Sequence, residues 1–225
     1  MHDIARDLGD APSERMIAEV DARWGQLGLP PGWVSDRSRV LAHEMVERLG
    51  TYVERARSQG WAAVGAEVSM RAALGRAVLR GQVDRIEADE QGRIRIVDYK
   101  TGSTATRKAD VPRHAQLGAY QVALAVGAFD DHLSGVGVEV GEGGPESSGA
   151  ALLQLGKAAG RRGPRLEEQG RLADDPDPSW AHTLIAATAE GMAARTFSAR
   201  PEEQRCQRCP VRRTCPAQPE GASLA

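Results

Sequence analysis

Apolar residues recur at helical spacing in two segments near the start of the chain. The first segment, 13–27, starts at a possible N-cap, Ser13, and the second covers 36–58. Their apolar stripes are Ile17, Val20, Trp24 and Leu27 in the first, and Leu41, Met45, Leu49, Tyr52 and Val53 in the second. The Pro30-Pro31-Gly32 run between them ends the first helix. The pattern predicts two amphipathic helices joined by a short turn.

The hydrophobic period then shortens to that of strands. Segments 61–70, 77–88 and 93–99 are β-branched and alternating, and the polar stretch 89–92 between the last two predicts a hairpin turn. Later segments predict helices over 111–127 and about 179–195, strands over about 133–140 and 150–155, and an exposed polar loop over 156–178. This order predicts one mixed α/β domain with an N-terminal helical portion.

Composition narrows the class of protein. The 225 residues are 41% hydrophobic and 27% charged, which is typical of a globular chain. The net charge is −2, so any site for nucleic acid has to be a local basic patch. The longest apolar stretch, 120–129, is too short to span a bilayer, and the N-terminus lacks a secretory hydrophobic region. We therefore expect a soluble cytoplasmic protein with no membrane partner.

Two aspartates fall opposite each other if the hairpin turn is centred on Gln91. Residues whose numbers sum to 182 are then cross-strand neighbours, which places Asp84 against Asp98 with Cβ atoms about 5 Å apart. Lys100 shares their face, and the apolar Val83, Val97 and Tyr99 alternate onto the other. Paired carboxylates favour a divalent ion such as Mg²⁺ or Mn²⁺, and the lysine suits metal-assisted phosphodiester hydrolysis. The alternative is an ordinary solvated hairpin with paired Asp and Lys.

The segments Gly-Gln-Val-Asp-Arg-Ile (81–86) and Val-Asp-Tyr-Lys-Thr-Gly (97–102) resemble the signature of the PD-(D/E)XK nuclease superfamily, specifically its RecB-type branch. The resemblance covers almost the whole chain and implies a restriction-endonuclease-like mixed sheet flanked by helices. It assigns Asp84, Asp98 and Lys100 to catalysis, with the two carboxylates and the Tyr99 main-chain carbonyl as metal ligands.

Further residues match motifs of that branch. Gln116 and Tyr120, at i and i+4 of one helix, match its Gln-x-x-x-Tyr motif and are implied to support the site and contact DNA. His2 resembles the histidine ligand of an upstream motif whose glycine would precede residue 1, and Glu67 fits an acidic position before Asp84 as a secondary metal ligand. The incomplete motif suggests a chain that begins inside its own family's pattern.

Three cysteines occupy one short window as Cys206-x2-Cys209-x5-Cys215. The spacing and the two Cys-Pro pairs resemble the C-terminal part of the [4Fe–4S] site of AddB- and AdnB-type nucleases. That cluster needs four thiolates, and the sequence has no fourth cysteine, so we expect the cluster to be incomplete in this chain. Zinc bound by the three cysteines and a histidine such as His182 is the alternative.

Arginines could provide the local basic patch for DNA. They cluster in the polar loop and around the cysteines, where they could follow a phosphate backbone or simply be solvated: Arg161, Arg162, Arg165, Arg171, Arg205, Arg208, Arg212 and Arg213.

The resemblance implies a metal-dependent deoxyribonuclease that acts as a single-strand exonuclease in double-strand-break end resection and recombinational repair, in the nucleoid. The chain contains no Gly-x4-Gly-Lys-[Ser/Thr] motif, so a helicase motor would come from the parent chain or a partner subunit. We expect a helical portion over 1–60, a nuclease core over 61–200 and a cysteine-rich tail over 201–225. Alternatives are a stand-alone four-cysteine nuclease of CRISPR adaptation, or a non-catalytic DNA-binding or scaffold module with a decayed metal site.

Overall fold

The computed structural model of the chain describes residues 2–141, 143–156, 163–196 and 198–222. The chain divides into two compact units, Met1–Ala186 and Ala187–Ala225, and each is considered by itself. The first unit contains a five-stranded sheet in the order β1-β2-β3-β4-β5. Its strands are β1 (Ala62–Leu74), β2 (Ala77–Ala88), β3 (Ile94–Lys100), β4 (Ser147–Gln154) and β5 (Arg165–Gln169). Only the β3–β4 pair is parallel, so the sheet is mixed as expected.

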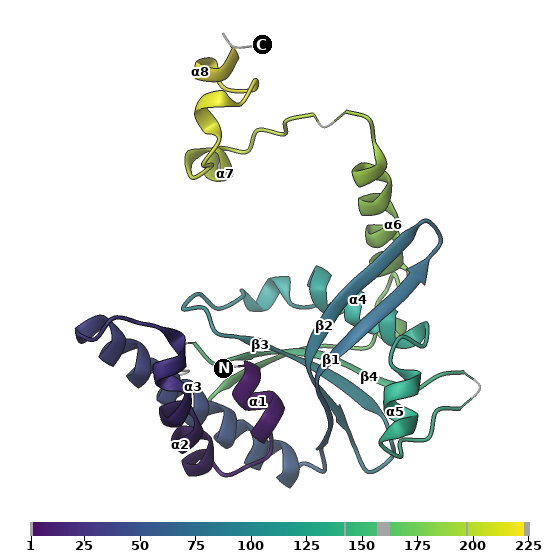
Figure 1. Cartoon of the computed structure of the whole chain (residues 1–225). Helices are drawn as coiled ribbons and strands as arrows, with labels where there is room; N and C mark the ends of the chain where they lie inside the picture. Colours follow the sequence, from purple (N-terminus) through teal and green to yellow (C-terminus); the bar gives the residue numbers. More distant parts are fainter. Residues whose placement is uncertain (1, 142, 157–162, 197, 223–225) are drawn as a thin grey trace. The chain divides into compact units, whose positions relative to one another are not determined.

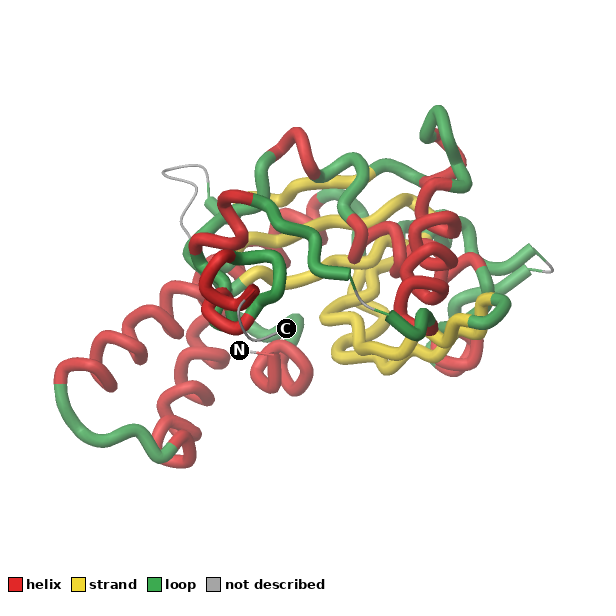
Figure 2. Tube along the Cα trace, turned by 90° about the horizontal axis from the view of Figure 1, so that it is seen from above, coloured by secondary structure: helices red, strands yellow, loops and turns green. Residues whose placement is uncertain are grey.

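Helices cover both faces of this sheet. The N-terminal group is α1 (His2–Leu8), α2 (Ser13–Arg23), the short 3-10 helix η1 (Trp24–Leu27) and α3 (Trp33–Ser58). Figure 2 shows α2 and α3 as a helical hairpin. Two further helices follow β3 in the chain, α4 (Ala115–Ala125) and α5 (Asp130–Gly135). The predicted α/β class with an N-terminal helical portion is confirmed (Figure 1).

Two apolar cores lie on the two faces of the sheet. Leu117 and Leu124 of α4 pack with Ile86 and Ile96 in one core. In the other, Leu49 of α3 and Met16 of α2 pack with odd-numbered residues of β3, Val97 and Tyr99. Side chains alternate along a strand, so even-numbered positions of β3, including Asp98, face α4. The sheet therefore presents its aspartate to one helical layer and the neighbouring aromatic ring to the other.

The register of the β2–β3 hairpin is the predicted one. Arg85 pairs with Val97 and Ile86 with Ile96, so partner numbers sum to 182. Asp89 closes the turn, because its Oδ1 accepts hydrogen bonds from the N–H groups of Gln91 and Arg93. Gly92 takes a φ of 76°, which a side chain would strain.

Several predicted elements differ in the structure. Residues 133–140 form no strand: α5 covers 130–135 and the following residues are irregular. The loop expected over 156–178 contains β5 and the 3-10 helix Leu172–Asp174, and α1 and α5 were not predicted. Val83 joins the core of Ile86 and Ile96, so its placement beside Val97 and Tyr99 was wrong. The long β1–β2 hairpin bends along its length (Figure 1), and Glu67 of β1 takes a φ of 50°.

The second unit holds the cysteine segment. It contains the last residues of α6 (Trp180–Ala193), then α7 (Glu203–Gln207), the 3-10 turn Arg212–Thr214 and α8 (Pro219–Ala222). Across the described part of the chain, none of the helices has the length and apolar character that crossing a membrane requires.

Candidate metal centre and active site

The first part of the site lies where α1 meets the bend in the β1–β2 hairpin. His2 Nδ1 lies 2.9 Å from Glu67 Oε1 and 3.1 Å from Asp84 Oδ1. One ligand atom from each of these three residues falls within 4.8 Å of the others. The positive φ of Glu67 is uncommon for a residue with a side chain, and it occurs at this cluster. The structure thus brings together the histidine, the secondary glutamate and one aspartate that the sequence singled out.

Asp84 is held by the neighbouring strand. Its Oδ2 accepts a hydrogen bond of 2.5 Å from the Tyr99 N–H, which leaves Oδ1 toward His2. Burial raises the pKa of Asp84 to about 6, an effect opposed by the Tyr99 hydrogen bond and reinforced by the negative charge of Asp98. A cation bound beside this carboxyl group would favour its ionised form and lower the pKa.

Asp98 is the centre of a second set of contacts. Gln116 Nε2 donates to Asp98 Oδ1 at 2.7 Å, and the Tyr120 hydroxyl donates to the same oxygen at 3.2 Å. Gln116 also links outward, since its Oε1 accepts from Lys100 Nζ at 2.7 Å and its Nε2 donates to the Tyr120 hydroxyl at 2.7 Å. Gln116 and Tyr120 therefore act from one face of α4, one turn apart, as their spacing predicts.

The other carboxylate oxygen of Asp98 has different surroundings. Oδ2 is buried and accepts no hydrogen bond from the described residues, although Lys100 Nζ lies 2.8 Å away as an ion pair. Asp98 is only 4% exposed because α4 covers it, so it does not lie on a solvated face as the alternative of an ordinary hairpin requires. Lys100 itself keeps 30% of its side chain accessible.

These donors fit a divalent cation. Carboxylate oxygens with one imidazole nitrogen suit Mg²⁺ or Mn²⁺, and the under-satisfied Asp98 Oδ2 is an oxygen that a cation would complete. His2, Glu67 and Asp84 form the tight group, whereas Asp98 lies outside it among the described residues. The Tyr99 carbonyl stays a prediction.

Sequence reasoning missed the residue that fixes α1. Arg85, 2% exposed, donates to the Gly9 carbonyl at 3.3 Å and to Asp10 Oδ1 at 3.0 Å, just beyond the last turn of α1. Its Nε donates to the buried Glu87 at 2.7 Å. Neighbouring residues of β2 thus serve two faces of the sheet: Asp84 contacts His2 at the start of α1, and Arg85 holds the segment after its end. In the sequence, the one pointer to this residue is its place directly after Asp84.

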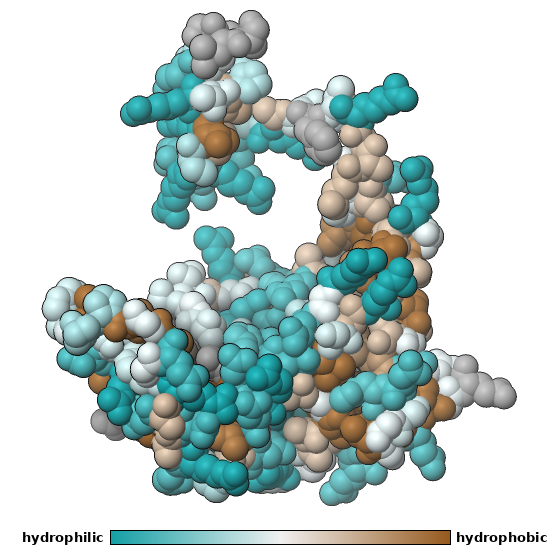
Figure 3. Space-filling model, in the orientation of Figure 1, coloured by the Kyte–Doolittle hydropathy of each residue, from teal (hydrophilic) through white to brown (hydrophobic). Residues whose placement is uncertain are grey.

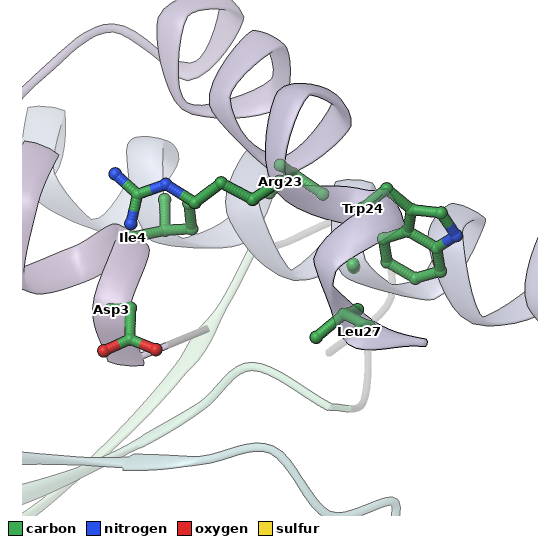
Figure 4. A pocket seen from close by; sticks show the side chains of 7 residues that line it. Asp3, Ile4, Arg23, Trp24 and Leu27 are labelled. Atoms are coloured by element: carbon green, nitrogen blue, oxygen red, sulfur yellow. The ribbon is translucent and has the colours of Figure 1, made fainter. Parts of the chain in front are cut away.

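A small pocket adjoins the histidine-bearing helix. Its volume is about 120 Å³, and it lies between α1 and the end of α2, where η1 begins. Figure 4 shows Asp3 and Ile4 on one side of it, Trp24 and Leu27 on the other, and Arg23 extending toward α1. Asp3, which lines this pocket, directly follows His2 in α1.

The structure gives less support to the predicted metal site at the cysteines and to the predicted DNA-binding arginines. The cysteines are free and half-buried, and among the described residues their sulfurs form no group of three at ligand distance. His182 lies exposed on α6. Carboxylates already pair with four of the arginines proposed for DNA, and Arg161 and Arg162 lie outside the described residues; the paired ones are Arg165, Arg171, Arg205 and Arg212.

Comparison with known proteins gives one family. A family model described as the PD-(D/E)XK nuclease superfamily matches residues 1–216, which is nearly the whole chain. No curated protein matches the chain. The matched range includes the hairpin, α1, α4 and all three cysteines.

Proposed function

The chain belongs to the PD-(D/E)XK nuclease superfamily, with its restriction-endonuclease-like fold, and from this premise we propose a Mg²⁺- or Mn²⁺-dependent deoxyribonuclease that cuts single-stranded DNA. The family establishes the nuclease class and the need to bind nucleic acid. The observation that carries the finer proposal is the joining of two contact sets across one hairpin: His2 and Glu67 around Asp84, and Lys100 and Gln116 around Asp98.

Each side chain has a task in phosphodiester hydrolysis. His2, Glu67, Asp84 and Asp98 would hold the cation, which when bound activates water and stabilises charge on phosphate oxygens. Lys100 places an ammonium beside Asp98, where it balances charge that develops on the phosphate. Gln116 fixes Lys100 and Asp98 relative to each other, and Tyr120 holds the same Asp98 oxygen from α4.

The biological role is a further part of the proposal. The two strand motifs resemble those of the RecB-type branch, which supports an exonuclease in double-strand-break end resection and recombinational repair. The sequence contains no Gly-x4-Gly-Lys-[Ser/Thr] motif, which supports a helicase supplied from elsewhere. The same proposal divides the chain into a helical portion 1–60, a nuclease core 61–200 and a cysteine-rich tail 201–225. In a complete protein, the tail would hold an iron–sulfur cluster.

Cleavage of an end-labelled oligonucleotide tests the activity. We expect fragments with Mg²⁺ or Mn²⁺, none with EDTA, and none from the nearly isosteric Asp98→Asn variant, while Asp36→Asn, exposed at the first turn of α3, keeps full activity. Equal cleavage by Asp98→Asn would remove the site assignment. DNA binding with no cleavage by the native chain would favour the non-catalytic module instead.

Substrate preference needs matched substrates. Single-stranded DNA should be cut faster than blunt duplex, and ATP should change neither rate, since the chain carries no ATP-binding motif. Binding should be weak, because the net charge of −2 gives little long-range attraction to phosphates, and cleavage should fall with salt because each phosphate contact releases counterions. ATP-stimulated degradation of duplex by this chain alone would overturn the motor-dependent role.

A further inference from the structure

Two arginines lie directly opposite each other on the long β1–β2 hairpin. Arg71 and Arg80 are register partners in the antiparallel ladder, and both are exposed. Like charges on facing positions destabilise a strand pair, so this arrangement has a local cost. Arg76, also exposed, adds a third cation beside the turn of the same hairpin. Such a concentration of positive charge is suited to holding an anion.

No carboxylate neutralises these three arginines among the residues that the structure describes. This separates them from the arginines of the polar loop and tail, where Arg165 pairs with Glu167 and Arg171 with Asp174. An arginine already paired has to exchange its carboxylate for a phosphate, whereas Arg71 and Arg80 have their guanidinium groups free. The hairpin is therefore the better basic surface in the first unit.

The arginine pair lies on the same two strands as the metal centre. Three register pairs, Val68–Val83, Ser69–Gln82 and Met70–Gly81, separate it from Glu67 and Asp84, and Ser69 and Gln82 of the middle pair are exposed. Gln82 Nε2 donates to the Glu67 carbonyl at 2.8 Å, which ties this intermediate pair to the site. With a rise of about 3.3 Å per residue, Arg71 is about 13 Å along β1 from Glu67, a span of a few nucleotides.

The opposite face of the β1–β2 hairpin is buried in the hydrophobic core. Val68, Met70 and Ala72 alternate with the exposed positions and are buried in the core that includes Tyr120 of α4. The arginines consequently face away from that core. Figure 1 shows the hairpin continuing beyond the other strands, and Figure 3 shows hydrophilic surface over the region where β1 and β2 cross the sheet and again along the hairpin.

We propose that Arg71 and Arg80, with Arg76 beside them, form a phosphate-binding subsite that holds the substrate strand a few nucleotides from the cleaved bond. The inference rests on the proposed nuclease function and adds a residue-level path for the DNA. A guanidinium binds phosphate through two N–H groups, so the facing pair can hold adjacent phosphates of one strand. The contact reads no base and should be independent of sequence.

Binding is measured by fluorescence anisotropy in the Asp98→Asn background, where the strand stays intact. For a labelled oligonucleotide that reaches both sites, Arg71→Gln/Arg80→Gln should weaken binding about tenfold or more. It should also reduce the salt slope of log K by about 1.4, for two phosphates released from a single strand. The matched control Arg15→Gln/Arg55→Gln removes the same charge from exposed positions of α2 and α3 and should change neither value.

Cleavage provides the independent readout. In the active chain, the hairpin variant should raise KM for the long oligonucleotide and leave kcat unchanged, and it should cut an oligonucleotide too short to reach the hairpin at the native rate. Its thermal midpoint should equal or exceed that of the native chain, because the like-charge contact is gone.

The outcomes separate the two proposals. If the native chain cuts but the hairpin and control variants behave alike, the subsite is wrong and the nuclease assignment stands. If the native chain does not cut, the nuclease assignment fails, and the anisotropy series still decides the subsite. Tighter competition by polyglutamate than by DNA of equal charge would indicate an acidic protein segment as the occupant and overturn the inference.

Discussion

The two oxygens of Asp98 have different tasks. Oδ1 accepts hydrogen bonds from Gln116 and Tyr120 and is thereby fixed in position. Among the described residues, Oδ2 has the Lys100 ammonium as its partner, accepts no hydrogen bond and keeps its capacity for a cation. This difference depends on α4, since both donors to Oδ1 come from that helix. The aspartate is thus oriented by one helix and left reactive on the other side.

Lys100→Ala should lower kcat for DNA cleavage by about 10²-fold or more, because a cation positioned at developing negative charge is lost. The chain should remain folded, since the lysine side chain is 30% accessible. Cleavage rates and circular dichroism measure the two effects. Lys108→Ala is the matched control, because Lys108 is an exposed lysine in the 3-10 helix before α4. A variant at Lys100 that retained native kcat would contradict the assigned role.

Asp84 should make the metal-free protein less stable as the pH rises. Burial raises its folded pKa to about 6, above the ordinary value near 3.9, so the folded state binds the proton more tightly than the unfolded state. The stabilisation is complete below about pH 4 and is lost between about pH 4 and 6. Urea unfolding of the native chain and Asp84→Asn should therefore show a stability difference in favour of Asn that grows across this window.

Adding Mn²⁺ above pH 6 should reverse that trend in the native chain, because the cation binds the ionised carboxylate. A stability difference independent of pH from 4 to 6 would mean that Asp84 has its ordinary pKa.

Local rules predicted much of the site at this scale. The sum of 182 gave the register of the β2–β3 hairpin up to Arg85–Val97, the pair next to the two aspartates, and the i, i+4 rule placed Gln116 and Tyr120 on one face of α4. The positive φ of Glu67 and the role of Arg85 escaped prediction. Both are set by contacts with α1, far away in the sequence, and no local periodicity reports them.

At the scale of elements, α1 is a short helix fixed at both ends. His2 contacts the carboxylates at its start, and Gly9 and Asp10 receive Arg85 beyond its end. Ile4 and Ala5 supply its buried face. Seven residues are too few for stability as an isolated helix, so these contacts determine whether α1 is formed.

Asp10→Asn should loosen α1 without unfolding the sheet. The change removes the negative partner of both Arg85 and Arg57, whose guanidinium lies 3.5 Å from Asp10 Oδ2. We expect weaker Mn²⁺ binding by a few-fold and faster hydrogen exchange of α1 amides, measured by calorimetry and mass spectrometry. Asp36→Asn carries the same charge change on α3 and should leave both unaltered. Unchanged exchange in α1 would show that Asp10 does not anchor it.

The elements that sequence reasoning missed have physical explanations. Residues 133–140 alternate like a strand, but Gly137 takes a φ of 83° and Leu133 packs into the core as part of α5. β5, in contrast, forms a strand although its sequence, Arg-Leu-Glu-Glu-Gln, is almost wholly polar. Edge strands of this kind are held by backbone pairing, here to β4, which leaves no hydrophobic pattern to detect.

At the scale of the whole molecule, the two units raise separate questions. The first contains the candidate metal centre with His2, Glu67, Asp84 and Asp98, and the second contains the three cysteines. The spacing of the three cysteines predicted a metal site in this segment. Spacing alone identifies neither the metal nor the fourth ligand. Cys206 accepts a hydrogen bond from the Glu202 N–H at 3.4 Å, a local contact within its own turn.

The 225-residue chain should hold iron poorly. Three thiolates cannot complete a four-cysteine cluster, so reconstitution with iron and sulfide should give well under one [4Fe–4S] per chain, measured as iron and sulfide content. Cys209→Ser should reduce the content further while DNA cleavage persists, because the hairpin site lies in the other unit. Four irons bound stably per chain would reveal a fourth ligand from another residue.

The double attachment of α1 links catalysis to a folding equilibrium. Each time the helix detaches from the sheet, His2 leaves the carboxylates, and the cation loses a ligand. Cation binding must then favour the attached helix by the same factor by which attachment tightens cation binding, since the two free energies form one thermodynamic cycle. At a cation concentration 100-fold above Kd this would reach at most about 2.7 kcal/mol, the limit for a detached state that binds no cation. If these residues hold the cation as proposed, its free concentration would set the fraction of molecules in which α1 is attached.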